Sequence, residues 1–212
     1  MSILSNMISD IEDKTLNDFM ASPISRSQVV LGYLITSWLV GIVLCLFTFV
    51  IGQTYVIING GDLVSFITFI KAFLLIVVSV VSFSSISFFC LSYVKSISTV
   101  SAINTMVGTL IGFLAGIYLA IGMFGKGLQT FIKWNPAGQI AALFRKVLME
   151  DPLDLAFENA PVETLEWYRK FYGIDLELAG GNQSILSMLV YILSITLIFY
   201  GLSIYRVSRM KR

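Results

Sequence analysis

The sequence predicts an all-α integral membrane protein, with four transmembrane helices, two external amphipathic helices between the last two spans and a cytoplasmic N-terminal helix. Of the 212 residues, 57% are hydrophobic and 13% are charged, against about 25% charged residues in soluble domains. The mean hydropathy is +0.86. Several apolar runs reach the roughly 20 residues that a helix needs to cross the hydrocarbon layer. Barrel strands would be shorter and would alternate, so these runs are predicted to be helices.

The composition also excludes several classes of function. A net charge of +1 gives no basic surface for nucleic acid. Histidine, the commonest general base and metal ligand, does not occur in the sequence. Cys45 and Cys90 lie in apolar runs, which predicts neither a disulfide framework nor a metal site. Because the phosphate-binding Gly-x-x-x-x-Gly-Lys-Ser/Thr pattern is also missing, we expect a chain that is not itself an enzyme.

Four segments are predicted to cross the membrane. They cover residues 29–51, 66–94, 96–125 and 184–205. Lys71 is the single charged residue among them, and it lies near enough to a span end for its ammonium to reach the interface. Ion-coupled transporters usually need ionisable groups in the middle of the membrane. The sequence therefore disfavours a secondary transporter.

Lysine and arginine near the span ends predict the orientation of the chain. One side of the membrane receives Lys14, Arg26, Lys95, Arg206, Arg209, Lys211 and Arg212. The opposite side has a short connection near Asn59 and a loop of residues 126–183, which is too long for its own basic residues to decide the topology. We expect both termini in the cytoplasm, the loop outside, and a bacterial plasma membrane as the location.

The first external helix is predicted to begin after Asn135. Asparagine followed by Pro136 is typical of a helix N-terminus, and apolar residues recur at helical spacing behind it. Pro152 is expected to end this helix. Arg145 lies on its predicted polar face. Its apolar face is expected to lie in the membrane interface or to fold back against the bundle.

Two further helices are predicted outside the spans. Residues 162–172 have acidic residues at the start and basic residues at the end, which suits the helix dipole, and Gly173 is expected to cap them. Residues 2–20 form an acidic, partly amphipathic pattern. Pro23 is expected to turn the chain from that helix toward the membrane. A helix in this position is well placed to contact a partner.

Small and hydroxyl residues form two patterns inside the spans. In the third span, glycine recurs every four residues, at Gly108, Gly112 and Gly116, and Ala120 continues the row. This row favours close helix packing, with a gate or subunit interface as the alternative. Hydroxyls in the second span either bond to helix carbonyls and neighbouring helices or line a polar path. They belong to Ser79, Ser82, Ser84, Ser85, Ser87 and Ser92.

Two groups of residues carry a family resemblance. Before the first span stand Ser-Asp-Ile-Glu-Asp-Lys (9–14), Leu-Asn-Asp-Phe (16–19) and Ser-Pro-Ile-Ser-Arg (22–26). After the third stand Trp-Asn-Pro (134–136) and Ile-Ala-Ala-Leu-Phe-Arg (140–145). In order, spacing and topology, the chain resembles the membrane (permease) subunit of type-two ABC exporters, an ABC transporter permease family. Such permeases usually have six spans, so we expect either that Met1 is an internal or truncated start or that two spans lie on another chain.

The resemblance implies a subunit of an ATP-driven exporter. It would move a lipophilic drug, peptide or lipid-like substrate out across the plasma membrane. Its partners would be a cytoplasmic ABC ATPase subunit, a second permease half in a homo- or heterodimer, and membrane lipid. No cofactor would bind this chain, since ATP and Mg would be held by the ATPase.

The resemblance also assigns roles to individual residues. A coupling helix would contact the ATPase through Glu12, Asp13, Leu16 and Phe19, and movement would pass to the first span through Pro23 and Arg26. The two external helices, the first of which has Asn135, Pro136 and Arg145, would cap the exit of the path. For the N-terminal segment the alternative is a solvated interfacial helix.

On this interpretation the chain has four regions. They are a coupling-type helix and turn (1–28), three spans (29–125), an external loop (126–183), and the last span with a basic cytoplasmic tail (184–212). A different class of function remains open: a non-transporting membrane protein, such as an immunity, assembly or sensor subunit, acting through the external loop. A membrane-embedded enzyme is disfavoured, because histidine and intramembrane carboxylates are missing.

Overall fold

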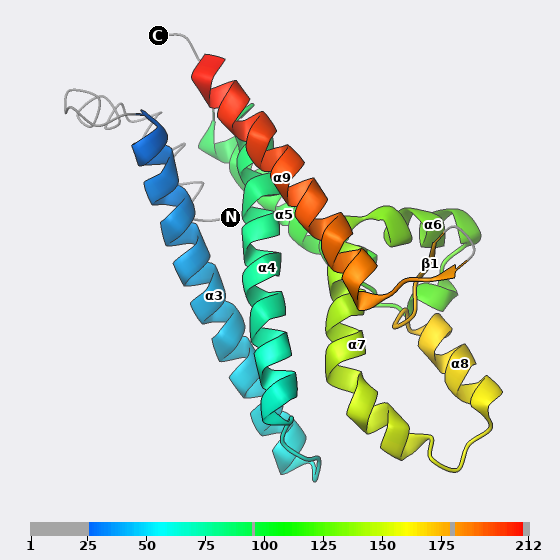
Figure 1. The fold of residues 1–212 in the computed structure, drawn as a ribbon. Coiled ribbons are helices and arrows are strands. Elements are labelled where there is room, and N and C mark those ends of the chain that lie inside the picture. The colour runs from blue at the N-terminus through cyan, green and yellow to red at the C-terminus, as the bar shows by residue number, and fades with distance from the viewer. Residues whose placement is uncertain (1–25, 95, 179–180, 210–212) are drawn as a thin grey trace. The chain divides into compact units, whose positions relative to one another are not determined.

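The computed structural model describes residues 26–94, 96–178 and 181–209, and these are almost entirely helical (Figure 1). The elements in chain order are α3 (Arg26–Ile58), α4 (Phe66–Leu91), α5 (Ile97–Leu114), η1 (Ile121–Met123), α6 (Lys126–Trp134), α7 (Pro136–Ala156), α8 (Val162–Phe171), β1 (Glu177–Leu178), β2 (Gly181–Asn182) and α9 (Ile185–Arg209). The two short strands pair antiparallel, with Glu177 opposite Asn182. The predicted all-α fold class is confirmed.

Four of the described helices are long and apolar enough to cross a membrane. The candidate spans are Leu31–Ile58, Phe66–Leu91, Ile97–Leu114 and Ile185–Ser203. Their surfaces are apolar: in α3, for example, Leu39, Val43 and Phe47 are 62%, 63% and 63% exposed. A continuous apolar surface of this kind is unfavourable in water and suits lipid as the solvent. The chain is therefore a multi-pass membrane protein with the four predicted spans.

The chain divides into two compact units. The first comprises the described residues of Met1–Gly52, Ile76–Val107 and Ser194–Arg212, and the second comprises those of Gln53–Leu75 and Gly108–Leu193. In the first unit an apolar cluster joins α3, α4 and α5. Its buried members are Leu34, Phe88, Leu91 and Val100, with Tyr200 of α9 packed against it.

The third span is shorter than the apolar run that predicts it. α5 ends at Leu114, and Gly116 follows with a φ of +66°, a left-handed conformation that glycine adopts without steric cost. The N–H groups of Gly116 and Ile117 donate to the carbonyls of Phe113 and Gly112, closing a Schellman motif. The prediction that this span continues to residue 125 is wrong, because a helix stop at glycine is invisible in hydropathy.

Other boundaries also differ from the predicted ones: α4 ends at Leu91 rather than at residue 94, and α9 runs to Arg209 rather than to residue 205. α3 continues past residue 51 to Ile58. α7 does not end at Pro152 but includes it and ends at Ala156. Pro152 is exposed, so the carbonyl one turn earlier can bond to water, while Leu153 beside it is buried and stabilises the continued helix. The second external helix, α8, matches its predicted range to within one residue.

Candidate functional site

The second unit contains a polar cluster centred on α7. The helix begins as the sequence predicts: the Asn135 side chain accepts a hydrogen bond from the N–H of Ala137 at 2.9 Å, and Pro136 is the first helical residue. The first two turns of α7 are buried all round, including Gln139, Ile140, Ala142 and Leu143. This helix therefore packs against protein, and its polar side chains are held at fixed positions.

Arg145 binds the end of the third span. Its Nη2 donates to the carbonyl oxygens of Ala115 at 2.6 Å and Gly116 at 2.9 Å, which directly follow α5. A helix C-terminus carries partial negative charge and carbonyls without intrahelical partners, so a guanidinium stabilises it. Burial lowers the pKa of Arg145, but arginine stays protonated in proteins.

Arg145 was predicted on the polar face of this helix, and in the structure its side chain is partly buried. Its Nη1 atom is buried and has no hydrogen-bond partner among the described residues, and no ion pair in the described part of the chain involves it. Helical periodicity predicted which side of α7 carries Arg145. It could not show that the residues after α5 lie against that side. The charge of Arg145 is thus directed at backbone carbonyls alone.

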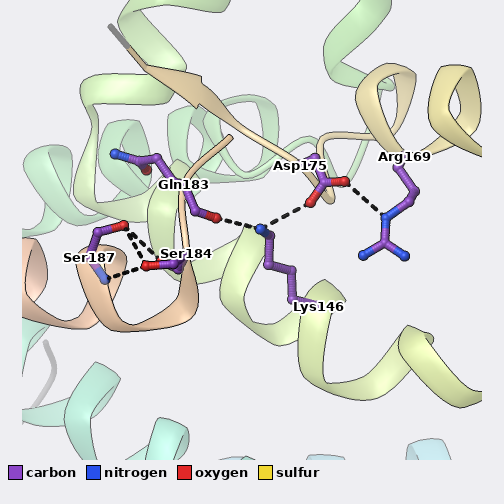
Figure 2. A network of polar contacts seen from close by, with 6 residues as sticks. All are labelled: Lys146, Arg169, Asp175, Gln183, Ser184 and Ser187. Carbon is purple, nitrogen blue, oxygen red and sulfur yellow. Dashed lines mark hydrogen bonds and ion pairs between the residues drawn. The ribbon is translucent and has the colours of Figure 1, made fainter. Parts of the chain in front are cut away.

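Lys146, the next residue, connects α7 to the segment that follows α8 (Figure 2). Its Nζ lies 3.0 Å from Oδ1 of Asp175 and donates to the carbonyl of Gln183 at 2.6 Å. Oδ2 of Asp175 accepts from Nε of Arg169 at 2.9 Å. The Lys146 and Asp175 side chains are only 11% and 16% exposed. We call Lys146, Arg169, Asp175 and Gln183 the α7–α8 network.

Electrostatics favour the ionised form of Asp175. Burial by itself raises the pKa of this carboxyl, but the hydrogen bonds and positive charges of Lys146 and Arg169 outweigh burial and lower the pKa below its ordinary value. By contrast, the nearby pair of Lys170 and Glu177 is about half exposed, with 2.9 Å between Nζ and Oε1. Exposed pairs of this kind contribute little to stability.

The network also fixes the entry into the last span. Ser184 follows Gln183 and caps α9, because its Oγ accepts from the N–H of Ser187 at 3.2 Å (Figure 2). Near the N-terminus of α7, Nε2 of the fully buried Gln139 donates to the carbonyl of Lys133 at 2.6 Å. The hydroxyl of Tyr191 in α9 donates to the carbonyl of Trp134. These bonds connect the segment from α6 to the hairpin of β1 and β2 with the C-terminal end of α5 and the N-terminal part of α9.

The residues predicted to contact an ATPase cannot be placed in this cluster. Glu12, Asp13, Leu16, Phe19 and Pro23 lie outside the described residues, as does the whole predicted helix over residues 2–20. Arg26 is the first residue of α3. Their assignment therefore stays a prediction.

The glycine row of the third span is not continuous on one helix. Gly108 and Gly112 lie in α5, whereas Gly116 adopts its left-handed turn after the helix and Ala120 precedes η1. The row ends because the helix ends. The space beside Gly112 is filled by the Tyr118 ring, which folds back after the turn, and no described atom lies within 4 Å of a Cβ at Gly108.

Two serines of the second span form hydrogen bonds within their own helix, and one of them also bonds to α9. Ser82 and Ser85 donate to the carbonyls of Val78 and Val81 one turn earlier, at 2.7 and 2.9 Å. Ser82 also accepts from the hydroxyl of Thr196 in α9 at 2.6 Å. For these two serines the structure supports the helix-bonding interpretation rather than a polar path.

Sequence reasoning missed α6 and the α7–α8 network. α6 had a usable signal, since Leu128, Phe131 and Trp134 recur every three residues beside Lys126 and Lys133. Asp175 had no such signal, because it lies in the connection after α8 while its partner Lys146 lies in α7, and no periodicity relates the two.

Comparison with known proteins gives one result. Residues 1–205 match the family described as "ABC-2 family transporter protein". No curated protein and no solved structure gives a significant match to the chain.

Proposed function

The chain belongs to the ABC-2 family of transporter proteins, and from this premise we propose that it exports a lipophilic drug, peptide or lipid-like substrate across a bacterial plasma membrane. Membership makes it the membrane permease subunit of an ABC transporter and implies an ATPase partner. The match over residues 1–205 is the observation that carries the proposal, because it includes every described span.

The proposed energy source is ATP hydrolysis on the partner. The chain has no phosphate-binding loop of the Gly-x-x-x-x-Gly-Lys-Ser/Thr type, so ATP and Mg would be bound by cytoplasmic ATPase subunits and this chain would be neither an enzyme nor a cofactor carrier. Lys71 is the one acidic or basic residue within the four described spans. Spans with so few charges suit a lipophilic substrate better than an ion.

The remaining parts of the proposal concern assembly and direction. Two permease halves, identical or different, would enclose the path, with both termini of this chain in the cytoplasm. Glu12, Asp13, Leu16 and Phe19 would contact the ATPase, and Pro23 and Arg26 would pass its movement to α3. The segment from α6 to the hairpin would lie outside and cap the exit.

The test measures ATPase stimulation and export together. The chain is co-purified with its ATPase partner, reconstituted in liposomes, and compared with Glu12→Lys, which reverses one charge of the proposed coupling helix. We expect this variant to lose ATP-hydrolysis stimulation and outward transport of a fluorescent lipophilic dye. The matched control is Glu158→Lys, the same change at an exposed loop residue, which should keep both.

Two outcomes would contradict the proposal. One is normal stimulation and export by Glu12→Lys, and the other is a chain that never co-purifies with an ATPase. The second outcome would favour a non-transporting immunity, assembly or sensor subunit, which family membership otherwise disfavours.

A further inference from the structure

Arg145 carries a partly buried positive charge that no carboxylate of the described residues neutralises. Its neighbours differ in this respect, since Lys146 and Arg169 share the carboxylate of Asp175 at 3.0 and 2.9 Å. Burial lowers the pKa of Arg145, and no negative charge in the described part of the chain offsets the loss of hydration. Because arginine stays protonated in proteins, the charge at this position is uncompensated.

At least two of the five N–H donors of this guanidinium lack an acceptor among the described residues. Nη2 donates to the carbonyls of Ala115 at 2.6 Å and Gly116 at 2.9 Å. Nη1, which carries two hydrogens, is buried and has no hydrogen-bond partner there. A buried donor without an acceptor costs free energy, and more so when the donor is charged. An added acceptor would therefore be bound favourably.

The guanidinium is held close to the turn that follows α5. A Cβ at Gly116 would lie 3.2 Å from Nη2 of Arg145 and 2.9 Å from Cγ1 of Ile121, so only glycine allows so close an approach. Ile121 is itself buried. A cation that is already positioned loses little freedom on binding, and it attracts an anion more strongly where water is partly excluded.

The unused donors are best matched by an oxyanion. A guanidinium has two edges that can each hold both oxygens of a carboxylate or phosphate, and Nη2 contributes one hydrogen to each edge. Both hydrogens are bonded to neutral carbonyls in the structure. Because opposite charges attract more strongly than a charge and a dipole, an oxyanion can displace one carbonyl and bind along that edge.

The residues that directly follow Gly116 add an apolar surface beside the cation. Ile117, Tyr118 and Leu119 are 70%, 60% and 39% exposed. An apolar chain attached to the oxyanion would remove part of this surface from water or lipid headgroups. The combination of a cation and exposed apolar side chains suits a ligand that has both an anionic group and an apolar chain.

We propose that Arg145 forms a binding site for an anionic amphiphile, whose carboxylate or phosphate binds the guanidinium and whose apolar chain lies against Ile117 and Leu119. An occupied site would neutralise the charge and supply acceptors for Nη1. The inference goes beyond the proposed function, because it rests on the contacts of Arg145 and requires neither transport nor an ATPase.

Equilibrium binding to the full chain tests this site. The chain is inserted in phosphatidylcholine nanodiscs and titrated with dansyl-undecanoate at alkaline pH, where the probe is ionised. Displacement by unlabelled dodecanoate defines the specific signal. We expect saturable binding of the acid and no specific binding of its methyl ester. Arg145→Met should weaken binding of the acid about tenfold or more, since it removes a charge-assisted bond. Lys126→Met, at an exposed cation, is the matched control and should bind like the parent.

Arg145→Lys is the second variant, because Arg145→Met also removes bonds that stabilise the fold. Lysine keeps the charge but cannot hold an oxyanion along a planar edge, so we expect weaker binding than in the parent. The proposal is overturned if the parent binds the acid and its ester alike, or if both Arg145 variants bind the acid as the parent does. Displacement of the probe by inorganic phosphate would indicate a site for a free anion and would overturn the amphiphile as ligand. Loss of export with unchanged binding of the acid would count against the proposed function alone.

Discussion

In the first unit apolar packing and a hydroxyl pair join the helices, whereas in the second, cations bound to carbonyls and a carboxylate join them in addition to buried apolar side chains such as Leu143 and Ile192. The first unit has the cluster of Leu34, Phe88, Leu91 and Val100 and the bond from Thr196 to Ser82. The second has Arg145 on the end of α5 and Lys146 on Asp175. The ion pairs described in the structure all lie between Lys146 and Glu177.

This difference follows from the cost of charge in each surrounding. A charged side chain within hydrocarbon costs several kcal/mol, so packing and hydroxyl bonds must serve there. Near water a cation can bind two or three acceptors with a smaller loss of hydration. The second unit can therefore gain stability from single charged residues in addition to its apolar packing, while the first depends on apolar packing and hydroxyl bonds.

Replacing Arg145 should have the largest effect. Arg145→Met removes both hydrogen bonds to the carbonyls of Ala115 and Gly116 and leaves those acceptors partly buried. Because charge-assisted bonds contribute about 1.5–3 kcal/mol each, we expect a loss of about 3 kcal/mol in the free energy of unfolding. Denaturant titration in detergent micelles measures it. Lys126→Met, at an exposed cation, should change little, and equal losses in both variants would refute the role of Arg145.

Neutralising Asp175 should cause the second-largest loss in the free energy of unfolding. Asp175→Asn leaves Lys146 and Arg169 without their shared carboxylate, and we expect a loss of about 2 kcal/mol near pH 7, since the network is mostly buried. Glu177→Gln, which breaks the exposed pair with Lys170, is the control and should be indistinguishable from the parent.

The same carboxylate predicts a pH dependence. Its pKa in the folded protein lies below the ordinary value of 3.8, so its stabilising contribution is complete above that pH and is lost as the pH falls through the folded-state pKa. Unfolding measured from pH 6 down to the acid limit should show this loss in the parent protein, and Asp175→Asn should lack that part of it. An identical acid profile in both proteins would mean that Asp175 does not carry the effect.

A methyl group at Gly116 should have a smaller effect. Gly116→Ala forces a left-handed φ of +66° on an L side chain and puts its Cβ 2.9 Å from Cγ1 of Ile121. The conformational cost alone is about 1–2 kcal/mol. Gly108→Ala provides a matched control in α5, where the space is open and alanine favours the helix, so it should be neutral or slightly stabilising. If the two variants unfold alike, the turn at Gly116 is not constrained as described.

The hydroxyl pair of the first unit should show the smallest effect. Thr196→Val removes the donor to Ser82, and bonds of this kind within membranes average about 0.6 kcal/mol in double-mutant cycles. A cycle with Ser82→Ala measures the coupling directly. A coupling as large as the effect of Arg145→Met would break the contrast between the two units.

The spans could be predicted because the thickness of the bilayer sets a minimum length for an apolar helix that crosses it. Apolar runs of that length are visible in the hydropathy of the sequence. The boundaries were harder, since a glycine turn at Gly116 and a tolerated Pro152 depend on what lies beside them. Local signals found Asn135, Pro136 and Gly173, the last of which caps α8 with a φ of +69°. Contacts such as Arg145 with Ala115, 30 residues apart, have no local signal, because only the folded chain brings them together.

The scarcity of charge in the described spans has a consequence for energetics. An electric field across the membrane does work only on charge that moves through it, about 2.3 kcal/mol for one elementary charge and 100 mV. Lys71 lies near one end of α4, and the other described spans have no Asp, Glu, Lys or Arg. Tilting or separating these helices transfers essentially no gating charge. The conformational cycle of this subunit should therefore run at the same rate in polarised and depolarised vesicles.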